Sequence, residues 1–497
     1  MDINIEIQNL LKEIGPGHMS TTAYDTAWVA RLGEIDTDLS NQAIEWICEN
    51  QLPDGSWGAK DIFYYPDRVI CTLAAMIALT HRGRRARDKN QIEKGLVALD
   101  RITSGATQGL AMASNGTTVG FEMIVPTLVA EAEKLGLIKQ QGERILGRIK
   151  KMRELKMEKI KGIKISRHIT PAFSSEMVGS DHIDLLDIND LQESNGSIGN
   201  SPAATAHFAQ FVRKSDKKAM AYIRSVAQAG GGIPFASPFD IFERAWVLWN
   251  LSLFMPSLHQ EMQQFCEPHT AHLMKQWDIH QGVGFSETYT PNDADDTSLT
   301  FSVLNKFGFS VDIQTVLNYE EDEYFRCYPL ESNSSISVNI HVLDALNQAG
   351  FDKNHSAVQK ILKYLKYTRK DNSFWLDKWH TSPYYPTSHA ILAAHHYDFE
   401  MCEQAVKWIL STQKADGSWG STPNLSTAEE TAYCIQALKV WEKYHSQIQK
   451  GRIEQASIWL KKNYKLPYPS LWIGKVLYCP EHVVTSTILS ALGLARQ

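Results

Sequence analysis

The octapeptides Gln51-Leu-Pro-Asp-Gly-Ser-Trp-Gly58 and Gln413-Lys-Ala-Asp-Gly-Ser-Trp-Gly420 share the pattern Q-x-x-D-G-S-W-G, although they lie in opposite halves of the chain. A third copy, at residues 192–199, lacks the tryptophan. Each copy follows a helical pattern and joins a glycine turn to an Asp or Ser that can cap the next helix. The tryptophan can pack over that helix while its N–H finds a partner. We interpret the repeats as structural joints between successive helices.

Helical periodicity dominates the rest of the chain. Apolar residues recur at spacings of three and four in the segments 41–52, 68–79, 121–137, 403–413 and 428–444. Strand-like alternation is rare and short. A chain of 497 residues is also longer than one ordinary core requires. Because both halves carry a copy of the repeat, the sequence predicts an all-α protein of two barrels, each with alternating inner and outer helices.

Composition and charge argue against several classes of protein. The net charge of −6 argues against a nucleic-acid-binding protein, which needs a broad basic field. No stretch reaches the roughly 18–20 apolar residues of a membrane-spanning helix, and the acidic N-terminal segment lacks the basic and apolar regions of a signal peptide. The seven cysteines are odd in number and scattered, which is typical of free thiols in a reducing compartment. We therefore expect a cytoplasmic protein.

The segment Pro291-Asn-Asp-Ala-Asp-Asp-Thr-Ser-Leu-Thr300 holds three carboxylates within four positions, Asp293, Asp295 and Asp296. An EF-hand calcium loop is excluded, because the sixth residue counted from Asp293 is not Gly and the twelfth is not Glu. Like charges this close cannot all ionise, so one carboxyl group keeps its proton. The crowding therefore predicts a carboxylic acid that stays available as a proton donor.

Together with the repeats and the D-x-D-D motif, several short segments resemble class II diterpene cyclases, which cyclise geranylgeranyl diphosphate by protonating it. In the family's order, these segments are 20–30 (STTAYDTAWVA), 119–122 (VGFE), 201–206 (SPAATA), 241–246 (IFERAW) and 377–380 (DKWH). The resemblance extends over nearly the whole chain. It implies two α6-α6 barrels, called β and γ, with the active site at their interface. The γ barrel, at 20–235, is expected to be inserted into the β barrel of residues 1–19 and 236–497.

The resemblance also implies roles for single residues. Asp295 is expected to be the general acid that delivers the proton, and Asp293 and Asp296 are expected to tune it. His341 lies where family members place a hydrogen-bond partner of the acid, although a satisfied buried histidine is an equal interpretation. Asn339 is a second candidate for the same task. The metal motifs D-D-x-x-D and N-D-x-x-S-x-x-x-E are absent from the sequence, so the diphosphate is expected to stay on the product.

A diphosphate needs cationic partners. By resemblance, these are Lys156 and Lys378. Lys156 lies in a basic run, 151–167, whose simpler interpretation is a solvated face. Mg²⁺ is expected from the family as a cofactor, but LAMASN replaces the acidic cluster of the plant enzymes. Glu122 and Asn115 remain as the metal candidates.

The final step of such a reaction needs a group that accepts a proton. Plant enzymes that make copalyl diphosphate hold a water with a His/Asn pair, and the resemblance puts Glu193 in place of the Asn and Ser174, or a neighbour, in place of the His. Without that pair the cation can run through hydride and methyl shifts. We therefore expect kolavenyl diphosphate, with a clerodane skeleton, and keep halimadienyl and copalyl diphosphate as alternatives. A class I terpene synthase or a phosphatase is the expected downstream partner.

Travelling cations also need aromatic faces. The sequence does not choose among Trp246, Trp249, Phe285, Tyr289, Trp379, Tyr384, Tyr385 and Trp472.

Other functions share parts of this pattern. A squalene-type triterpene cyclase has the D-x-D-D motif and the tryptophan repeats, but it is usually longer and carries an apolar membrane-docking patch. A prenyltransferase β-subunit is also an α-barrel, but its zinc site needs an Asp/Cys/His set that the sequence does not show. A ligand-binding α-barrel protein without catalysis is the alternative from another class.

Overall fold

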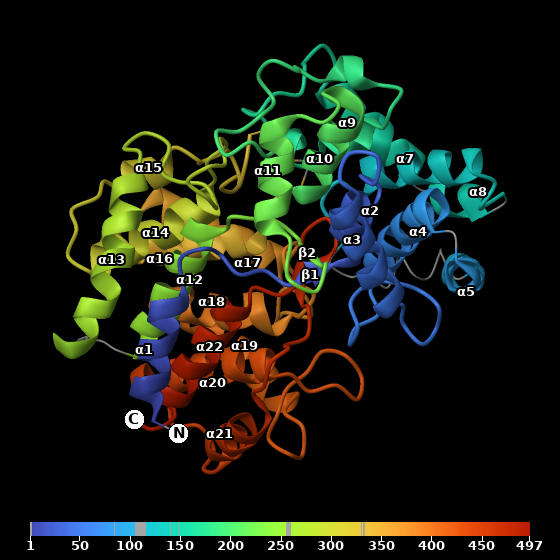
Figure 1. Ribbon diagram of the computed structural model, residues 1–497. Coiled ribbons are helices and arrows are strands. Elements are labelled where there is room, and N and C mark those ends of the chain that lie inside the picture. The colour runs from blue at the N-terminus through green and yellow to red at the C-terminus, as the bar shows by residue number, and fades with distance from the viewer. Residues whose placement is uncertain are drawn as a thin grey trace.

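The computed structural model describes residues 2–83, 85–104, 116–139, 141–147, 149–254, 260–329, 331 and 333–497. Helices make up most of this part of the chain, and its strands are two residues long. The predicted all-α class is therefore confirmed. Two groups of helices lie side by side, one at the upper right and the other at the lower left of Figure 1.

The larger group, which we call the β ring, is a closed ring of six inner helices surrounded by outer ones. Each inner helix packs against the next, and the last returns to the first. The inner helices are α12 (Asp240–Phe254), α14 (Ala294–Lys306), α16 (Ile336–Gln348), α18 (Tyr384–Ala394), α20 (Ala428–Tyr444) and α22 (Glu481–Leu494). The outer helices are α1 (Ile3–Glu13), α13 (Gln260–Gln276), α15 (Gln314–Leu317), α17 (Ser356–Thr368), α19 (Phe399–Ser411) and α21 (Arg452–Asn463).

The smaller group, the γ ring, is built in the same way. Its inner elements also close on themselves, because the last of them packs against the first. They are α2 (Ala23–Ala30), α4 (Tyr65–Arg82), α7 (Phe121–Lys134), η1 (Thr170–Val178) and α10 (Pro202–His207). The elements around them are α3 (Thr37–Glu49), α5 (Ala86–Ser104), α8 (Gln141–Leu146), α9 (Ile149–Lys159), η2 (Ile183–Leu185), η3 (Phe208–Val212) and α11 (Lys217–Val226).

The γ ring is an insertion whose two ends meet. Strand β1 (Thr21–Thr22) precedes α2 and pairs antiparallel with β2 (Ile233–Pro234), which follows α11. The N-terminal helix α1 packs against α22 of the other ring, so both chain termini lie on the β ring (Figure 1). The exact boundaries at residues 20 and 235 stay a prediction.

The tryptophan repeats are structural joints, as the sequence predicts. The fully buried Trp57 donates its indole N–H to the carbonyl of Ile47, and Trp419 donates to that of Ile409, each at 2.8 Å. In both cases the acceptor belongs to the preceding outer helix, so the tryptophan side chain joins that helix to the next. Trp375 makes the same contact at 2.8 Å with a carbonyl ten residues before it.

A hairpin of the β ring reaches into the γ ring. Strands β3 (Trp472–Ile473) and β4 (Leu477–Tyr478) pair antiparallel, with Lys475 at the turn between them. The Lys475 side chain is fully buried, and its ammonium group lies 2.6 Å from Glu176 Oε1 of η1 and 2.6 Å from Ser201 Oγ. The hairpin thus joins the two rings through a buried ion pair.

Candidate active site

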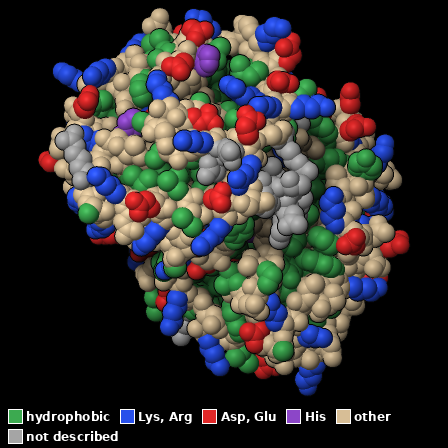
Figure 2. All heavy atoms as spheres, turned by 90° about the vertical axis from the view of Figure 1, so that its right-hand side faces the viewer, with side chains coloured by type: hydrophobic (Ala, Val, Ile, Leu, Met, Phe, Trp, Pro, Cys, Tyr) green, Lys and Arg blue, Asp and Glu red, His purple; other side chains and the backbone are tan. Residues whose placement is uncertain are grey.

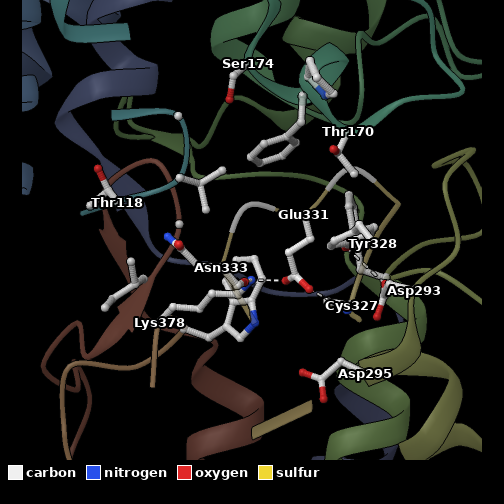
Figure 3. A pocket seen from close by; sticks show the side chains of 18 of the residues that line it. Thr118, Thr170, Ser174, Asp293, Asp295, Cys327, Tyr328, Glu331, Asn333 and Lys378 are labelled. Atoms are coloured by element: carbon white, nitrogen blue, oxygen red, sulfur yellow. Dashed lines mark hydrogen bonds and ion pairs between the residues drawn. The ribbon is translucent and has the colours of Figure 1, made fainter. Parts of the chain in front are cut away.

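A cavity of about 360 Å³ lies between the two rings. Its walls come from both of them: the γ ring supplies the segment 116–120 together with parts of α9 and η1, and the β ring supplies α14 and the β3–β4 hairpin. Figure 3 shows Asp295 at the lower end of the cavity and Ser174 at the upper end. The cavity therefore lies at the predicted interface of two helical barrels.

Aromatic side chains form much of the cavity wall. Of the candidates from the sequence, Phe285, Tyr289, Trp379 and Trp472 line it, whereas Trp246, Trp249, Tyr384 and Tyr385 are not among its lining residues. Sequence reasoning missed Phe239, Phe242 and Tyr478, which line it as well. Tyr478 and Phe239 lie at the end of β4 and just before α12, where no sequence pattern marks a cavity.

The three clustered carboxylates occupy the first turn of α14. Asp293 is the N-cap, and its Oδ1 accepts the backbone N–H of Asp296 at 2.8 Å. Its other oxygen accepts the hydroxyl of Tyr328 at 3.2 Å. The unpaired N–H groups of a helix N-terminus favour acidic side chains at these positions. All three carboxylates line the cavity, so the predicted acidic cluster is assembled at its wall.

Burial makes ionisation of this cluster unfavourable. It raises the pKa of Asp293 to about 7, and the neighbouring charge of Asp295 adds to that rise. The pKa of Asp296 is raised well above its usual value, first by burial and then by the charge of Asp293. Among the described residues, no group lies within hydrogen-bond distance of Asp296 Oδ1. The cluster consequently retains protons at neutral pH.

His341 of α16 holds Asp295 from below the cavity wall. Its Nδ1 lies 2.5 Å from Asp295 Oδ1, and its side chain is fully buried, whereas 14% of the Asp295 side chain is exposed. Asn339 does not share this task. Its amide is committed to the backbone of Phe325, to which it donates at 3.0 Å and from which it accepts at 2.8 Å. The geometry thus favours the predicted partner His341 and does not support Asn339, which instead holds a loop.

Among the described residues, Lys156, Lys159 and Lys378 line the cavity, and carboxylates hold the first and the last of these. Lys156 lies 2.8 Å from Glu122 Oε2. Lys378 pairs with Glu331, as the dashed line in Figure 3 shows. The third, Lys159, was missed by sequence reasoning, although its position three residues after Lys156 on one helix was a usable signal. Part of the basic run 151–167 therefore faces the cavity.

The two candidates for the proton-accepting region separate in space. Ser174 of η1 lines the cavity opposite Asp295 and has a non-helical backbone conformation inside η1. Glu193 is not among the lining residues. Its two oxygens accept the backbone N–H of Thr290 at 3.2 Å and the Thr290 hydroxyl at 2.7 Å. Glu193 is thus used to join a γ-ring turn to the loop before α14, and the geometry does not support its predicted position.

The described residues do not form a magnesium site at the predicted position. Glu122 is buried, and its oxygens accept the hydroxyl of Thr117 and the ammonium group of Lys156, each at 2.8 Å. Asn115 lies outside the described residues. A carboxylate neutralised by a lysine does not fit the ligand set of oxygen donors that Mg²⁺ needs. Mg²⁺ binding therefore stays a prediction from the resemblance.

One group of potential metal ligands lies elsewhere in the part of the chain that the structure describes. Asp240, His272 and Glu287 bring one ligand atom each to within 4.8 Å of one another. However, Arg244 Nη1 lies 3.6 Å from Asp240 Oδ2, the same oxygen that lies 3.1 Å from His272. A fixed guanidinium competes with any cation there, so these residues form an ion-pair network.

On the face of the molecule that Figure 2 shows, neither positive nor negative side chains predominate. Basic and acidic side chains are intermixed over it. Among the described helices, none is both long and apolar enough to cross a membrane.

Comparisons with known proteins agree with this geometry. The squalene-hopene cyclase C-terminal domain matches residues 328–440, and the prenyltransferase alpha-alpha toroid domain matches residues 16–115. The chain is 49% identical to the type B diterpene cyclase of Mycobacterium tuberculosis over 482 residues, which are 96% of each protein.

Solved structures of similar proteins have the same architecture. An ent-copalyl diphosphate synthase from Streptomyces platensis superposes with a TM-score of 0.80 at 25% identity and 100% coverage of both chains. For the ent-copalyl diphosphate synthase of Arabidopsis thaliana, the TM-score is 0.69 at 22% identity, over the whole of this chain and 63% of that one. The predicted resemblance is confirmed, and the chain belongs to the class II terpene cyclase family.

Proposed function

We propose that this enzyme cyclises geranylgeranyl diphosphate by protonating its terminal alkene from Asp295, and that the diphosphate stays on the product. One observation carries the proposal. A carboxyl group within a buried cluster that retains protons faces an aromatic-lined cavity, and lysines line that same cavity. The name of the Mycobacterium relative, a diterpene cyclase, supports a C20 substrate.

The acid end of the cavity meets the requirements of alkene protonation. The product of that step is a tertiary carbocation, so the conjugate base of the acid must be stabilised. His341 holds Asp295 Oδ1 at 2.5 Å, which leaves Oδ2 for the substrate. The proton passes from Oδ2 to the alkene, and ring closure moves the positive charge along the chain. Phe239, Phe242 and Trp472 line the same cavity, and aromatic rings there can stabilise a cation.

A second part of the cavity suits an anion. Lys156 and Lys159 come from the γ ring and Lys378 from the β ring, so a diphosphate placed among them touches both. Two of the lysines are now paired with Glu122 and Glu331. Phosphate oxygens are strong acceptors for such ammonium groups. Squalene carries no charge and has no use for this cluster, which favours a diphosphate substrate over a triterpene.

The product that we propose is kolavenyl diphosphate, formed after hydride and methyl shifts. Its support is the position of Glu193, the residue predicted for the proton-accepting region. Glu193 is engaged by Thr290 and is not among the described residues that line the cavity, so it is not placed to quench an early cation. Halimadienyl and copalyl diphosphate are the alternatives.

The test is incubation of the purified protein with geranylgeranyl diphosphate, enzymatic dephosphorylation, and identification of the alcohol by mass spectrometry and NMR. Squalene serves as the comparison substrate. A clerodane skeleton supports the full proposal, a copalyl skeleton refutes the proposed product, and turnover of squalene alone refutes the substrate class. Adding a chelator and then Mg²⁺ tests the predicted cofactor.

We also propose that the enzyme works in the cytoplasm and passes its product to a class I terpene synthase or a phosphatase. All seven cysteines are free thiols and buried, as is usual where the compartment is reducing. A product that keeps its diphosphate is a substrate for an enzyme that removes it.

A further inference from the structure

The proposed acid belongs to a chain of three titratable groups. Asp295 Oδ1 lies 2.5 Å from His341 Nδ1, and His341 Nε2 lies 2.9 Å from Nδ1 of His389, which comes from α18. The His341 side chain is fully buried and His389 is 2% exposed. Among the described residues, none offers a hydrogen-bond partner to His389 Nε2. This series of hydrogen-bonded groups therefore runs from the cavity wall into the core of the β ring and ends at His389.

Two proton arrangements satisfy both contacts while the two imidazoles are neutral. In the first, His389 Nδ1–H donates to His341 Nε2, and His341 Nδ1–H donates to Asp295 Oδ1. In the second, every bond is reversed: Asp295 donates to His341, and His341 donates to His389. The difference decides catalysis. Only the first arrangement leaves the proton of Asp295 on Oδ2, where an alkene can take it.

The end of the chain discriminates between the two arrangements. In the first, His389 Nε2 carries a bare lone pair, whereas in the second it carries an N–H group. A buried N–H without an acceptor is among the rarest defects in folded proteins, and unsatisfied acceptors are better tolerated. Because no described residue can accept a hydrogen bond from His389 Nε2, the first arrangement is favoured.

We propose that His389 is a positioning residue of the reaction: by donating Nδ1–H to His341 Nε2, it fixes the tautomer that presents Nδ1–H to Asp295. This inference rests on the proposed role of Asp295 as the acid. Without that donor, His341 can take the tautomer that carries its hydrogen on Nε2. Asp295 then donates through Oδ1 to the lone pair of His341 Nδ1, and its Oδ2 holds no proton for the alkene.

The surroundings keep His389 in the required neutral form. Burial lowers the pKa of His389 well below its usual value, and the nearby His341 and His380 add to this effect. The groups around the two imidazoles are Trp246 and Trp249 of α12, Asp295 of α14, Tyr385 of α18, Tyr433 of α20 and His380. Asp295 is thus the only carboxylate among these described neighbours, and the other groups around the two imidazoles are aromatic.

The variants that test this are His389→Phe, which removes the donor, and His389→Asn, whose amide N–H can donate from about the same place. The expected fall in kcat at pH 7 for His389→Phe is on the order of tenfold to hundredfold, with KM little changed. His389→Asn should regain most of kcat at pH 7.

A matched control lies just beyond the C-terminal end of α18, the helix that carries His389. His395 follows α18, is buried, and contacts His445 at 3.1 Å, away from the cavity lining. His395→Phe should leave kcat unchanged. If His389→Asn does no better than His389→Phe, the inference is wrong.

A measurement on the unaltered enzyme does not depend on whether a variant folds. The ¹⁵N chemical shifts of the imidazoles should show His341 neutral and protonated on Nδ1, and an Nε2–H tautomer would overturn the inference. The variant Asp295→Asn separates the two proposals: if it retains turnover, the proposed acid is wrong, whereas an unchanged kcat for His389→Phe with an inactive Asp295→Asn refutes the role of His389 alone.

Discussion

Replacing Lys475 by Met should destabilise the enzyme more than almost any other single change at the junction of the two rings. The ammonium group has no exposed surface and lies 2.6 Å from Glu176 Oε1 and 2.6 Å from Ser201 Oγ. It also lies 4.6 Å from the centre of the Phe173 ring. Met preserves the length and the apolar contacts of the side chain but leaves Glu176 as a fully buried carboxylate without its cation.

The size of the effect follows from what remains around Glu176. Its Oε1 keeps the hydroxyl of Tyr24 at 2.9 Å, whereas Oε2 has no partner among the described residues. Removing one member of a buried ion pair costs about 3–5 kcal/mol, because the other charge stays buried and unpaired. Burial already raises the pKa of Asp25 to about 7, and the charge of Lys475 opposes that rise. The loss of Lys475 therefore disfavours two carboxylates at once.

A double-mutant cycle measures this energy. Urea unfolding of Lys475→Met, Glu176→Gln and the double variant gives midpoints and slopes, from which the coupling follows. The double variant loses both charges of the pair and keeps only the buried Asp25, so it should recover most of the stability that Lys475→Met loses. Lys407→Met is the matched control, because Lys407 and Glu403 form an exposed pair at 2.8 Å on α19. Its expected cost is about 0.5 kcal/mol or less.

The charge of Lys475 does not stabilise the junction if Lys475→Met costs no more than Lys407→Met, or if Glu176→Gln brings no recovery in the double variant. In the first case the buried pair does not stabilise the junction. In the second case the loss comes from packing around the hairpin rather than from an unpaired charge. Turnover should fall with stability, because Trp472, Ile473 and Gly474 of the same hairpin line the cavity.

Three further predictions concern the cavity itself. Asp295→Asn should lower kcat by on the order of 10²–10⁴-fold without changing the circular dichroism spectrum, and a smaller loss than tenfold would contradict its role as the acid. Because burial raises the pKa of Asp293 from 3.8 to about 7, stability is full below about pH 4 and is lost as the pH rises to about 7. Asp293→Asn, which can still cap α14, should reduce the loss of stability that unfolding measurements show between pH 4 and 8. Lys378→Gln and Lys156→Gln should each raise KM by about tenfold or more, as expected for a lost charge-assisted hydrogen bond, whereas the exposed Lys161→Gln should not.

Sequence reasoning reached the acidic cluster and the helical joints because both are local. The D-x-D-D carboxylates share one helical turn, and each joint of Trp57 or Trp419 is formed by residues within ten positions. The joint of Trp375 makes the same indole contact, but its sequence does not match the repeat. Its turn has two residues at positive φ, Asp371 and Asn372, whereas the other copies have a single glycine, Gly55 or Gly417. The indole contact is preserved there, although the residue types and the backbone conformation of the turn are not.

The missed and misplaced residues depend on contacts between distant segments. His389 is separated by 48 positions from His341 and stands in a helix whose other positions are buried, so its sequence context is that of any core histidine. Asn339 lies two positions before His341 on α16, where a helix turns successive side chains in different directions, and it faces a loop instead of the acid. Glu193 depends on the docking of the γ ring against Thr290, which no local pattern encodes.

The location of the cavity explains why the junction of the rings matters for the chemistry. The acid belongs to the β ring, whereas Lys156 and Lys159 belong to the γ ring, so the distance between the proton donor and the diphosphate is set by how the rings dock. A substrate held at both ends folds productively only if that distance is constant, because a misplacement of about 1 Å is enough to lower a rate strongly. A buried ion pair is costly to desolvate but strict in geometry, which suits it to fixing a distance. Lys475 and Glu176 lie at that junction, and their hairpin is also a wall of the cavity. The pair therefore links the stability of the junction to the spacing that cyclisation requires.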